Sequence, residues 1–266
     1  MSVQVCGIMS VQVCGYKSLF CQLKNYRLMN IFIPHRHFDP SVPEMIDNQN
    51  NDPLILRDDL KNLQVINRLF GGLAAVLSEI KKLLLRMDKH EEISILDLAT
   101  GSADHPVAIA NFLYEKELNF KIVAVDKNPD ILEVARQQSK DFPEIHIEEH
   151  DILKLPYGSD SFDIVICSLA IHHFTEDEVI IILNHMNLIS RVALIVNDLN
   201  RTWPGAWTTW LYTHATTRNP MTLHDSYLSV LRGFTKSELG KMAVKAGIEK
   251  ITIKKRPFFR LLLIGE

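Results

Sequence analysis

The sequence predicts an α/β fold with a doubly wound sheet of seven strands, mainly parallel, in which the last strand is reversed. Short apolar runs rich in β-branched residues alternate with helical stretches after His90, which is the pattern of βαβ units. Only Arg256 and Pro257 separate the last two runs. The chain therefore turns back tightly there, and the final strand is expected to run antiparallel to its neighbours.

The composition is that of a globular protein. Of the 266 residues, 47% are hydrophobic and 23% are charged, which excludes a disordered, collagen-like or coiled-coil chain. The formal net charge of −3 provides no basic field for nucleic acid, so no nucleic-acid partner is expected. No apolar run reaches the roughly 20 residues that a membrane span needs, so no span is expected.

Residues 1–52 are expected to form an N-terminal extension that is poorly ordered and lies outside the fold. The segment MSVQVCG occurs twice, at Met1–Gly7 and Met9–Gly15. This repeat indicates a local duplication or an upstream start, with a functional N-terminal peptide as the alternative. A polar connector containing Pro and Asn follows at 39–53.

The cysteines, Cys6, Cys14, Cys21 and Cys167, indicate a reducing compartment. None of them forms a CxxC pair, and their spacing fits neither a disulfide framework nor a zinc site. We therefore expect a cytoplasmic location. The histidines are scattered along the chain, so no metal site is predicted.

Residues 53–90 are predicted to form an N-terminal helical cap. Apolar residues recur at steps of three and four between Leu54 and Met87, which is the period of an amphipathic helix. Gly71 and Gly72 interrupt this pattern, so the cap consists of two helices.

Residues 91–266 are predicted to hold the sheet and its connecting helices. The pairs Thr175 with Glu178 and Thr235 with Glu238 have the spacing of helix capping boxes. The expected strands are 93–99, 120–126, 144–151, 162–170, 191–199, 248–255 and 258–265.

The turn after the first strand is the first candidate ligand site, because ligands of open α/β sheets bind beyond the carboxyl ends of the strands. It reads DLATGSAD at Asp97–Asp104, and its small residues let a ligand approach the N–H groups of the next helix. The dinucleotide fingerprint G-x-G-x-x-G is absent. Packing alone explains such a turn equally well.

Acidic residues end the next two strands. Asp126 can accept hydrogen bonds from both hydroxyls of a ribose. Asp151 can accept from the exocyclic amine of adenine, and Ile152 can cover the ring. Each acid alone could instead cap a turn, but a loop and two acids in this order indicate a nucleoside ligand with a charged tail.

These motifs resemble those of the class I S-adenosylmethionine-dependent methyltransferases, and of their quinone-biosynthesis and small-molecule members in particular. The segments that carry the resemblance are Ile95–Asp104 (ILDLATGSAD), Val123–Asp126 (VAVD), Glu149–Pro156 (EHDILKLP) and Phe162–Phe174 (FDIVICSLAIHHF). The resemblance implies a Rossmann-like fold and S-adenosylmethionine as cofactor. The family usually has glycine where Ala99 and Ala103 stand here.

The resemblance also implies the binding residues. The first segment holds the methionine part of the cofactor, the second its ribose, the third its adenine, and the fourth faces the methyl group. The residues expected to bind the cofactor are Asp97, Ala99, Thr100, Gly101, Asp104, Asp126, Lys127, Asp151, Ile152, Ser168 and Ala170.

His172 and His173 are the candidate catalytic residues. A histidine near the methyl donor can act as general base for a hydroxyl, because its ordinary pKa is about 6.5. The alternative is that both residues only pack at the start of a helix.

A lid insertion is expected at about 200–233. Trp203, Trp207 and Trp210 fall at steps of four and three, on one face of a helix. That face either packs on the domain or shapes an apolar pocket for the methyl acceptor. His224, Asp225 and Arg232 are candidate polar anchors for the same acceptor.

The sequence thus predicts methyl transfer to an oxygen or carbon of a small apolar acceptor, aromatic or phenolic. A nicotinamide-dependent oxidoreductase shares the fold class and the ribose acid, but it would need the missing glycine fingerprint. A non-catalytic nucleoside-binding module on the same fold is the other alternative, because a fold does not by itself fix a function.

Overall fold

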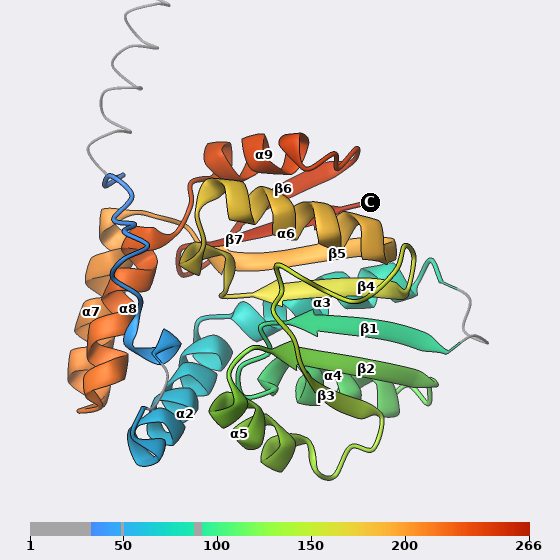
Figure 1. Cartoon of the computed structure of the whole chain (residues 1–266), viewed down its shortest axis with the longest axis horizontal. Coiled ribbons are helices and arrows are strands. Elements are labelled where there is room, and N and C mark those ends of the chain that lie inside the picture. The colour runs from blue at the N-terminus through green and yellow to red at the C-terminus, as the bar shows by residue number, and fades with distance from the viewer. Residues whose placement is uncertain (1–32, 49–50, 88–91) are drawn as a thin grey trace, which may run out of the picture.

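A seven-stranded sheet forms the centre of the protein (Figure 1). The computed structural model describes residues 33–48, 51–87 and 92–266. The strand order is β3-β2-β1-β4-β5-β7-β6. The strands are β1 (Ile93–Leu98), β2 (Phe120–Asp126), β3 (Ile145–Glu149), β4 (Phe162–Ser168), β5 (Ser190–Leu199), β6 (Ile251–Arg256) and β7 (Arg260–Gly265).

Only β7 runs against the others. The pairs β1–β2, β1–β4, β2–β3 and β4–β5 are parallel, whereas β7 is antiparallel to both β5 and β6. This confirms the predicted fold class, including the reversed last strand. The reversal sets Arg260, the first residue of β7, opposite Leu199 near the carboxyl end of β5.

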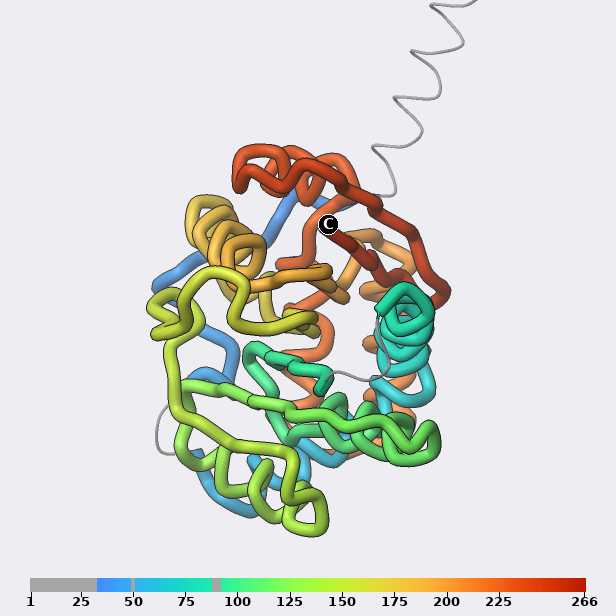
Figure 2. Tube along the Cα trace, turned by 90° about the vertical axis from the view of Figure 1, so that its right-hand side faces the viewer, coloured from blue at the N-terminus to red at the C-terminus, as the bar shows by residue number. Residues whose placement is uncertain are grey.

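Helices cover both faces of the sheet, as the opposite positions of α3 and α6 in Figure 2 illustrate. One core cluster joins α3 and α4 to the sheet, and a second joins α6 and α9 to the opposite face. The helices are α2 (Pro53–Leu69), α3 (Gly72–Leu84), α4 (Asp104–Tyr114), α5 (Pro129–Ser139), α6 (Glu176–Ile189), α7 (Trp203–Thr216), α8 (Pro220–Arg232) and α9 (Lys236–Lys245), with short 3-10 turns η1 (Met45–Asp47) and η2 (Ile171–His173).

Local sequence signals set the helix boundaries. Both predicted capping boxes form, with the threonine hydroxyl accepting from the backbone of the third helical residue in α6 and in α9. The two helices predicted within 53–90 also form, as α2 and α3, and α3 packs on a face of the sheet. The break between them is at Gly71, whose φ of 71° lies in the left-handed region that glycine adopts without strain.

No single helix in the described part of the chain is long and apolar enough to cross a membrane. The pair α2 and α3 passes the same length and composition test together, but the two helices are bent by 58° at their break.

The segment 33–48 packs against the domain, so the expectation that 1–52 lies outside the fold is wrong for these residues. Arg36 donates to the carbonyl oxygens of Arg232 (2.7 Å) and Phe174 (2.8 Å). Its guanidinium also lies 4.0 Å from the centroid of the Phe234 ring. These contacts reach residues far along the chain, and no local pattern predicts them. Residues 1–32, with the repeat, lie outside the described part.

The segment 33–48 together with α2, α7 and α8 forms a layer, here called the cap layer, beside the carboxyl ends of the strands (Figure 1). A buried polar contact joins two of its helices. Thr222 of α8 donates to the carboxylate of Asp59 in α2 (2.5 Å), and Asn62 donates to Thr222 (3.0 Å). Asp59 is 1% exposed, and burial raises its pKa to about 7, helped by the nearby carboxylates of Asp225 and Asp58.

Because of this raised pKa, we predict that the free energy of unfolding depends on pH. The unfolded chain ionises Asp59 near pH 4, whereas the folded protein ionises it only near pH 7. The folded state therefore loses stability as pH rises from about 4 to 7. Asp59→Asn removes this loss. Between pH 5 and pH 8 the free energy of unfolding of the variant should therefore rise relative to that of the wild type by about 3 kcal/mol.

Urea denaturation at pH 5, 6, 7 and 8 measures this difference. Asp141→Asn, at an exposed carboxylate, is the matched control and should track the wild type. A constant difference between Asp59→Asn and the wild type across this range would contradict the prediction.

Candidate functional site

One pocket opens at the carboxyl ends of β1, β2, β3 and β4, between the sheet and the cap layer. All the residues that the sequence proposed for cofactor binding line it: Asp97, Ala99, Thr100, Gly101, Asp104, Asp126, Lys127, Asp151, Ile152, Ser168 and Ala170. His172 and His173 line it too. The parallel strands thus bring motifs that are far apart in sequence to one cavity, as their shared direction requires.

The turn after β1 has an unusual backbone. Ala99, Gly101 and Ala103 have φ values of 52°, 57° and 60°, so every second residue is left-handed. For alanine this conformation costs roughly 1–2 kcal/mol. The two alanines at which the chain departs from the family's glycines are therefore held in a conformation suited to glycine. The resulting tight turn aims the loop and the start of α4 at the pocket.

Two carboxylates lie beneath this turn. Asp97 is 2% exposed and accepts a hydrogen bond from the Thr100 hydroxyl (2.7 Å). Burial raises the pKa of Asp97 to about 6. Burial also acts to raise the pKa of Asp104, but His105 and Asn67 lower it below its usual value. Both acids can therefore accept hydrogen bonds from a cationic ligand group at neutral pH.

Arg260 faces the same end of the pocket and was missed by the sequence analysis. Its side chain is 2% exposed, and its Nη2 donates to Asn67 Oδ1 (3.0 Å). Its Nε and Nη1 have no hydrogen-bond partner among the described residues. Burial lowers the pKa of Arg260 to about 10, so it remains cationic at neutral pH. The reversed strand β7 brings it here, and no local motif signals that.

Asp126 closes the end of β2. Its Oδ2 accepts from the Gly101 N–H (3.1 Å) and its Oδ1 from the Asn128 N–H (3.1 Å). Burial raises its pKa, although these N–H groups act to lower it. The carboxylate thus ties β2 to the turn after β1 while it lines the pocket. Asp151 accepts from the Leu153 N–H (2.9 Å), and Ile152 is buried beside it.

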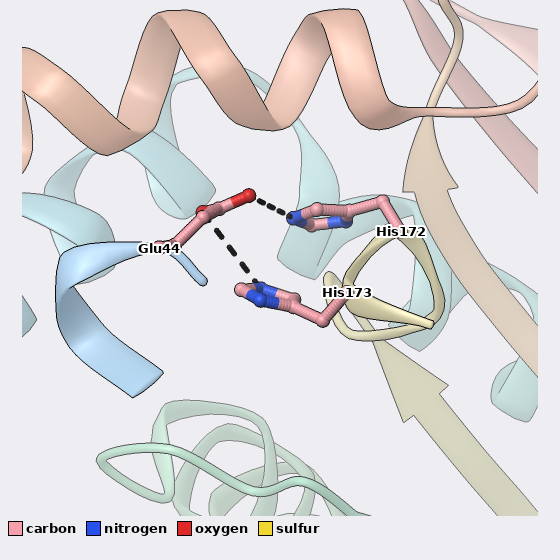
Figure 3. A group of neighbouring side chains, drawn as sticks. All are labelled: Glu44, His172 and His173. Carbon is pink, nitrogen blue, oxygen red and sulfur yellow. Dashed lines mark ion pairs between the residues drawn. The ribbon is translucent and has the colours of Figure 1, made fainter. Parts of the chain in front are cut away.

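The two histidines contact three carboxylates, those of Glu44 and Asp47 in the segment 33–48 and that of Asp198 in β5, and Figure 3 shows the contacts with Glu44. His172 Nδ1 lies 2.7 Å from Asp198 at the end of β5, and His173 Nδ1 lies 2.7 Å from Asp47. Glu44 lies between the rings, 4.0 Å and 3.9 Å from their Nε2 atoms. Burial acts to lower the pKa of His173, but Glu44 and Asp47 raise it to about 9. The rings belong to a buried charged network and do more than pack.

This network was outside the sequence prediction, which included no metal site. Glu44, His172 and His173 have ligand atoms within 4.8 Å of one another. Glu44 and Asp47 stand in the segment expected to lie outside the fold, more than a hundred residues before the histidines. No spacing rule could have joined them.

The tryptophans of α7 do not form a wall of this pocket. Trp207 and Trp210 are 61% and 38% exposed, and none of the three tryptophans lines the pocket. Helix α7 instead turns Thr209 toward the pocket. The small buried residues Gly205, Ala206 and Thr213 lie on its inner side, which lets α8 pack closely. Trp203 is half-buried against the α7–α8 contact.

The three candidate polar anchors act mainly on the cap layer. Asp225 does line the pocket, but its carboxylate accepts from the N–H groups of Met45 and Ile46 (2.9 Å each). His224 is half-exposed and contacts Asp225 (2.7 Å). Arg232 is buried 3.5 Å from Glu44 and does not line the pocket. Asp225 and Arg232 therefore fix the segment 33–48, and His224 and Arg232 do not line this pocket.

Comparison with known proteins adds a family to this geometry. A family model described as a methyltransferase domain matches residues 89–247. The demethylmenaquinone methyltransferase of Deinococcus radiodurans is 36% identical over 89 residues, which cover 33% of this chain and 35% of that protein. The chain thus spans about a third of the length of the curated relatives it matches.

Solved structures share the fold. A SAM-dependent methyltransferase from Aquifex aeolicus has a TM-score of 0.54 at 15% identity, covering 81% of this chain and 98% of that one. Magnesium protoporphyrin IX methyltransferase from Synechocystis PCC 6803, solved with bound S-adenosylhomocysteine, has a TM-score of 0.50 at 14% identity. That match covers 82% of this chain and 88% of the other.

Asp126→Ala should weaken the binding of S-adenosylhomocysteine by about 1–3 kcal/mol, because a charged acceptor for the ribose hydroxyls is lost. Calorimetric titration of the purified protein measures this. Asp141→Ala is the exposed control and should bind as the wild type does. Unchanged affinity in Asp126→Ala would show that the ribose lies elsewhere.

Trp207→Ala should change neither the affinity for S-adenosylhomocysteine nor the turnover of a methyl acceptor by more than about twofold, since surface substitutions away from a site are nearly neutral. The side chain is 61% exposed and outside the pocket. Titration and a turnover assay on the same preparation measure both. A loss of turnover with unchanged cofactor affinity would contradict this prediction and would show that Trp207 contacts the acceptor.

Proposed function

The chain belongs to the S-adenosylmethionine-dependent methyltransferases, and we propose that it transfers the methyl group of this cofactor to an oxygen or carbon of a small apolar acceptor, aromatic or phenolic. The observation that carries the proposal is the shared pocket. It is lined by the whole set of cofactor candidates and, on the side of the cap layer, by apolar side chains. The nicotinamide-dependent alternative is set aside, because the family uses a different cofactor.

In this proposal the methionine end of the cofactor lies at the turn after β1. Its carboxylate pairs with Arg260, whose Nε and Nη1 have no other hydrogen-bond partner among the described residues. Its ammonium group is close to Asp97 and Asp104. An unpaired buried guanidinium is costly, so a ligand carboxylate there is favoured. The ribose then lies at Asp126, and the adenine lies between Asp151 and Ile152.

The acceptor occupies the part of the pocket nearest the cap layer. Ile46, Leu63, Phe70, Phe174 and Val230 line the pocket and offer apolar walls. Polar side chains of the cap layer, among them Asp59 and Asp225, line the pocket as well. The apolar walls suit a small ring compound, whose burial is driven by the hydrophobic effect. Two of the matched proteins are named for a demethylmenaquinone and for magnesium protoporphyrin IX, both ring compounds, which supports this acceptor class.

The reaction needs alignment more than acid–base help. The nucleophilic oxygen or carbon of the acceptor forms a bond to the methyl carbon while the bond from that carbon to sulfur breaks, and S-adenosylhomocysteine leaves. A pocket that holds donor and acceptor in line supplies most of the required rate. His172 and His173 line the pocket, and we assign them to the orientation and activation of the acceptor atom.

His172→Asn should lower methyl transfer by about tenfold or more while the affinity for S-adenosylhomocysteine changes by less than about twofold, because positioned acid–base or orienting groups contribute in this range. The assay supplies labelled cofactor and a panel of phenols and quinols, with mass spectrometry of the products. His146→Asn, at an exposed histidine of β3, is the control. No methylated product from any member of the panel would contradict the proposed acceptor class.

Parallel titrations with S-adenosylhomocysteine and NAD test the cofactor independently of the acceptor. Micromolar binding of the first corresponds to about −8 kcal/mol. Binding of NAD alone would overturn the proposal.

A further inference from the structure

Three side chains that can bind a metal converge where the segment 33–48 meets the turn after β4. One ligand atom from each of Glu44, His172 and His173 lies within 4.8 Å of the ligand atoms of the other two (Figure 3). The rings of the two histidines are 4.4 Å apart and tilted by 33°. Their edges point toward the same carboxylate, so one small ion could contact all three.

The other nitrogen of each ring is already bound. His172 Nδ1 is 2.7 Å from Asp198, and His173 Nδ1 is 2.7 Å from Asp47. A ring nitrogen this close to a carboxylate oxygen donates to it, so each Nδ1 is occupied and Nε2 is the ligand atom on the side of Glu44, as in carboxylate–histidine–metal sites. Binding of an ion displaces the Nε2 proton that His173 carries at neutral pH.

One carboxylate oxygen of Glu44 lacks a hydrogen-bond partner among the described residues. Glu44 is 1% exposed, and its Oε2 accepts from the Ser229 hydroxyl (2.6 Å). Oε1 is the oxygen that lacks a partner among these residues. The Nη1 of Arg232 is 3.5 Å away, longer than the 2.7–2.9 Å of a charge-assisted hydrogen bond. A buried carboxylate oxygen without a partner is costly unless a cation completes it.

The nearby guanidinium groups hydrogen-bond to backbone carbonyls. Arg36 donates to the carbonyl oxygens of Phe174 and Arg232, and Arg232 donates to that of Val42. Of these two cations, only Arg232 comes within ion-pair distance of Glu44. The carboxylates of Asp47 and Asp198 are directed at the histidines. The site therefore retains two imidazole ligands and one carboxylate ligand for a cation.

We propose that Glu44, His172 and His173 bind a divalent transition metal ion of the zinc or iron(II) kind, with its open coordination positions toward the pocket. Two imidazoles and one carboxylate are the ligand set of catalytic zinc and of non-haem iron(II) sites. Magnesium and calcium prefer oxygen ligands throughout and do not fit it. With bonds of about 2.0–2.1 Å, tetrahedral ligands lie roughly 3.3 Å apart. His172 Nε2 is 4.0 Å from Oε1 of Glu44 and His173 Nε2 is 3.9 Å from Oε2, and the three ligand atoms lie within 4.8 Å of one another, so the side chains must close toward the ion to reach this distance.

The ion would complete the acceptor end of the pocket, an inference that rests on the proposed function. A phenolic or enolic oxygen could occupy an open position, and the metal would stabilise its negative charge as a Lewis acid. The hydroxyl proton leaves to solvent water, and the oxygen then attacks the methyl carbon as described above. With an ion at this site, the expected acceptors are compounds that carry a phenolic or enolic oxygen next to an apolar ring.

The test is metal binding by the full chain, without an affinity tag that contains histidine and after treatment with a chelator. Cys6→Ser, Cys14→Ser and Cys21→Ser are introduced together, because thiolates of residues outside the described part would also bind zinc. Calorimetric titration with Zn²⁺ should give one ion per chain with micromolar or tighter affinity, and Mg²⁺ should not bind.

Variants locate the ion. Glu44→Gln keeps the size of the side chain, and Glu44→Gln and His173→Gln should each weaken Zn²⁺ binding by about tenfold or more, the effect expected on losing a ligand. His146→Gln, at the exposed histidine of β3, should bind as its parent does. Retained affinity for S-adenosylhomocysteine shows that a variant has folded.

A measurement on the parent protein tests the proposal even if the variants fail to fold. X-ray absorption of the zinc-loaded protein should show two imidazole ligands, oxygen ligands and no sulfur. Absence of Zn²⁺ binding at 100 μM, about 5.5 kcal/mol of affinity, would overturn the proposal. Equal binding by both ligand variants, or a shell without imidazole, would overturn it too. Zinc binding without any methyl transfer would instead leave the metal site standing and contradict the proposed function.

Discussion

Every parallel strand of the sheet ends at the same edge, and this constraint gathers the polar groups of the molecule into one place. Asp97, Asp126 and Asp198 all lie at or near strand ends and are nearly completely buried. Burying carboxylates costs free energy unless each finds partners. The partners come from the turn after β1, from α4 and from the turn after β4, so satisfying these groups shapes the pocket.

The cap layer covers the open end of the sheet and takes these charges out of water, so it must also supply partners for them. Arg36 and Asp225 attach the segment 33–48 to the turn after β4 and to α8 through backbone groups. The same segment supplies Glu44 and Asp47 to the histidines. A stretch without regular secondary structure over most of its length thus completes the electrostatics of the site while it covers it.

The reversed strand β7 contributes in the same way. Its antiparallel course places Arg260 at the edge where the parallel strands end. There the guanidinium lies close enough to Asp104 and Asp198 to feel both of their charges. A seventh parallel strand would carry its last residue to that edge instead of its first. The direction of one strand therefore decides that a buried cation, the guanidinium of Arg260, faces the turn after β1.

The sequence by itself determined the sheet, its order of motifs and the residues that line the pocket at the ends of β1, β2 and β3, because hydrophobic period, capping pairs and strand-end acids are local signals. It also marked the turn where Ala99 and Ala103 adopt left-handed backbones. Only the tertiary structure decided which face of α7 turns inward and which charges meet His172 and His173. Helix rotation depends on the partner helix, here the close approach of α8 to small residues. Contacts between Glu44 and residues more than a hundred positions away follow from folding, since no local pattern encodes them.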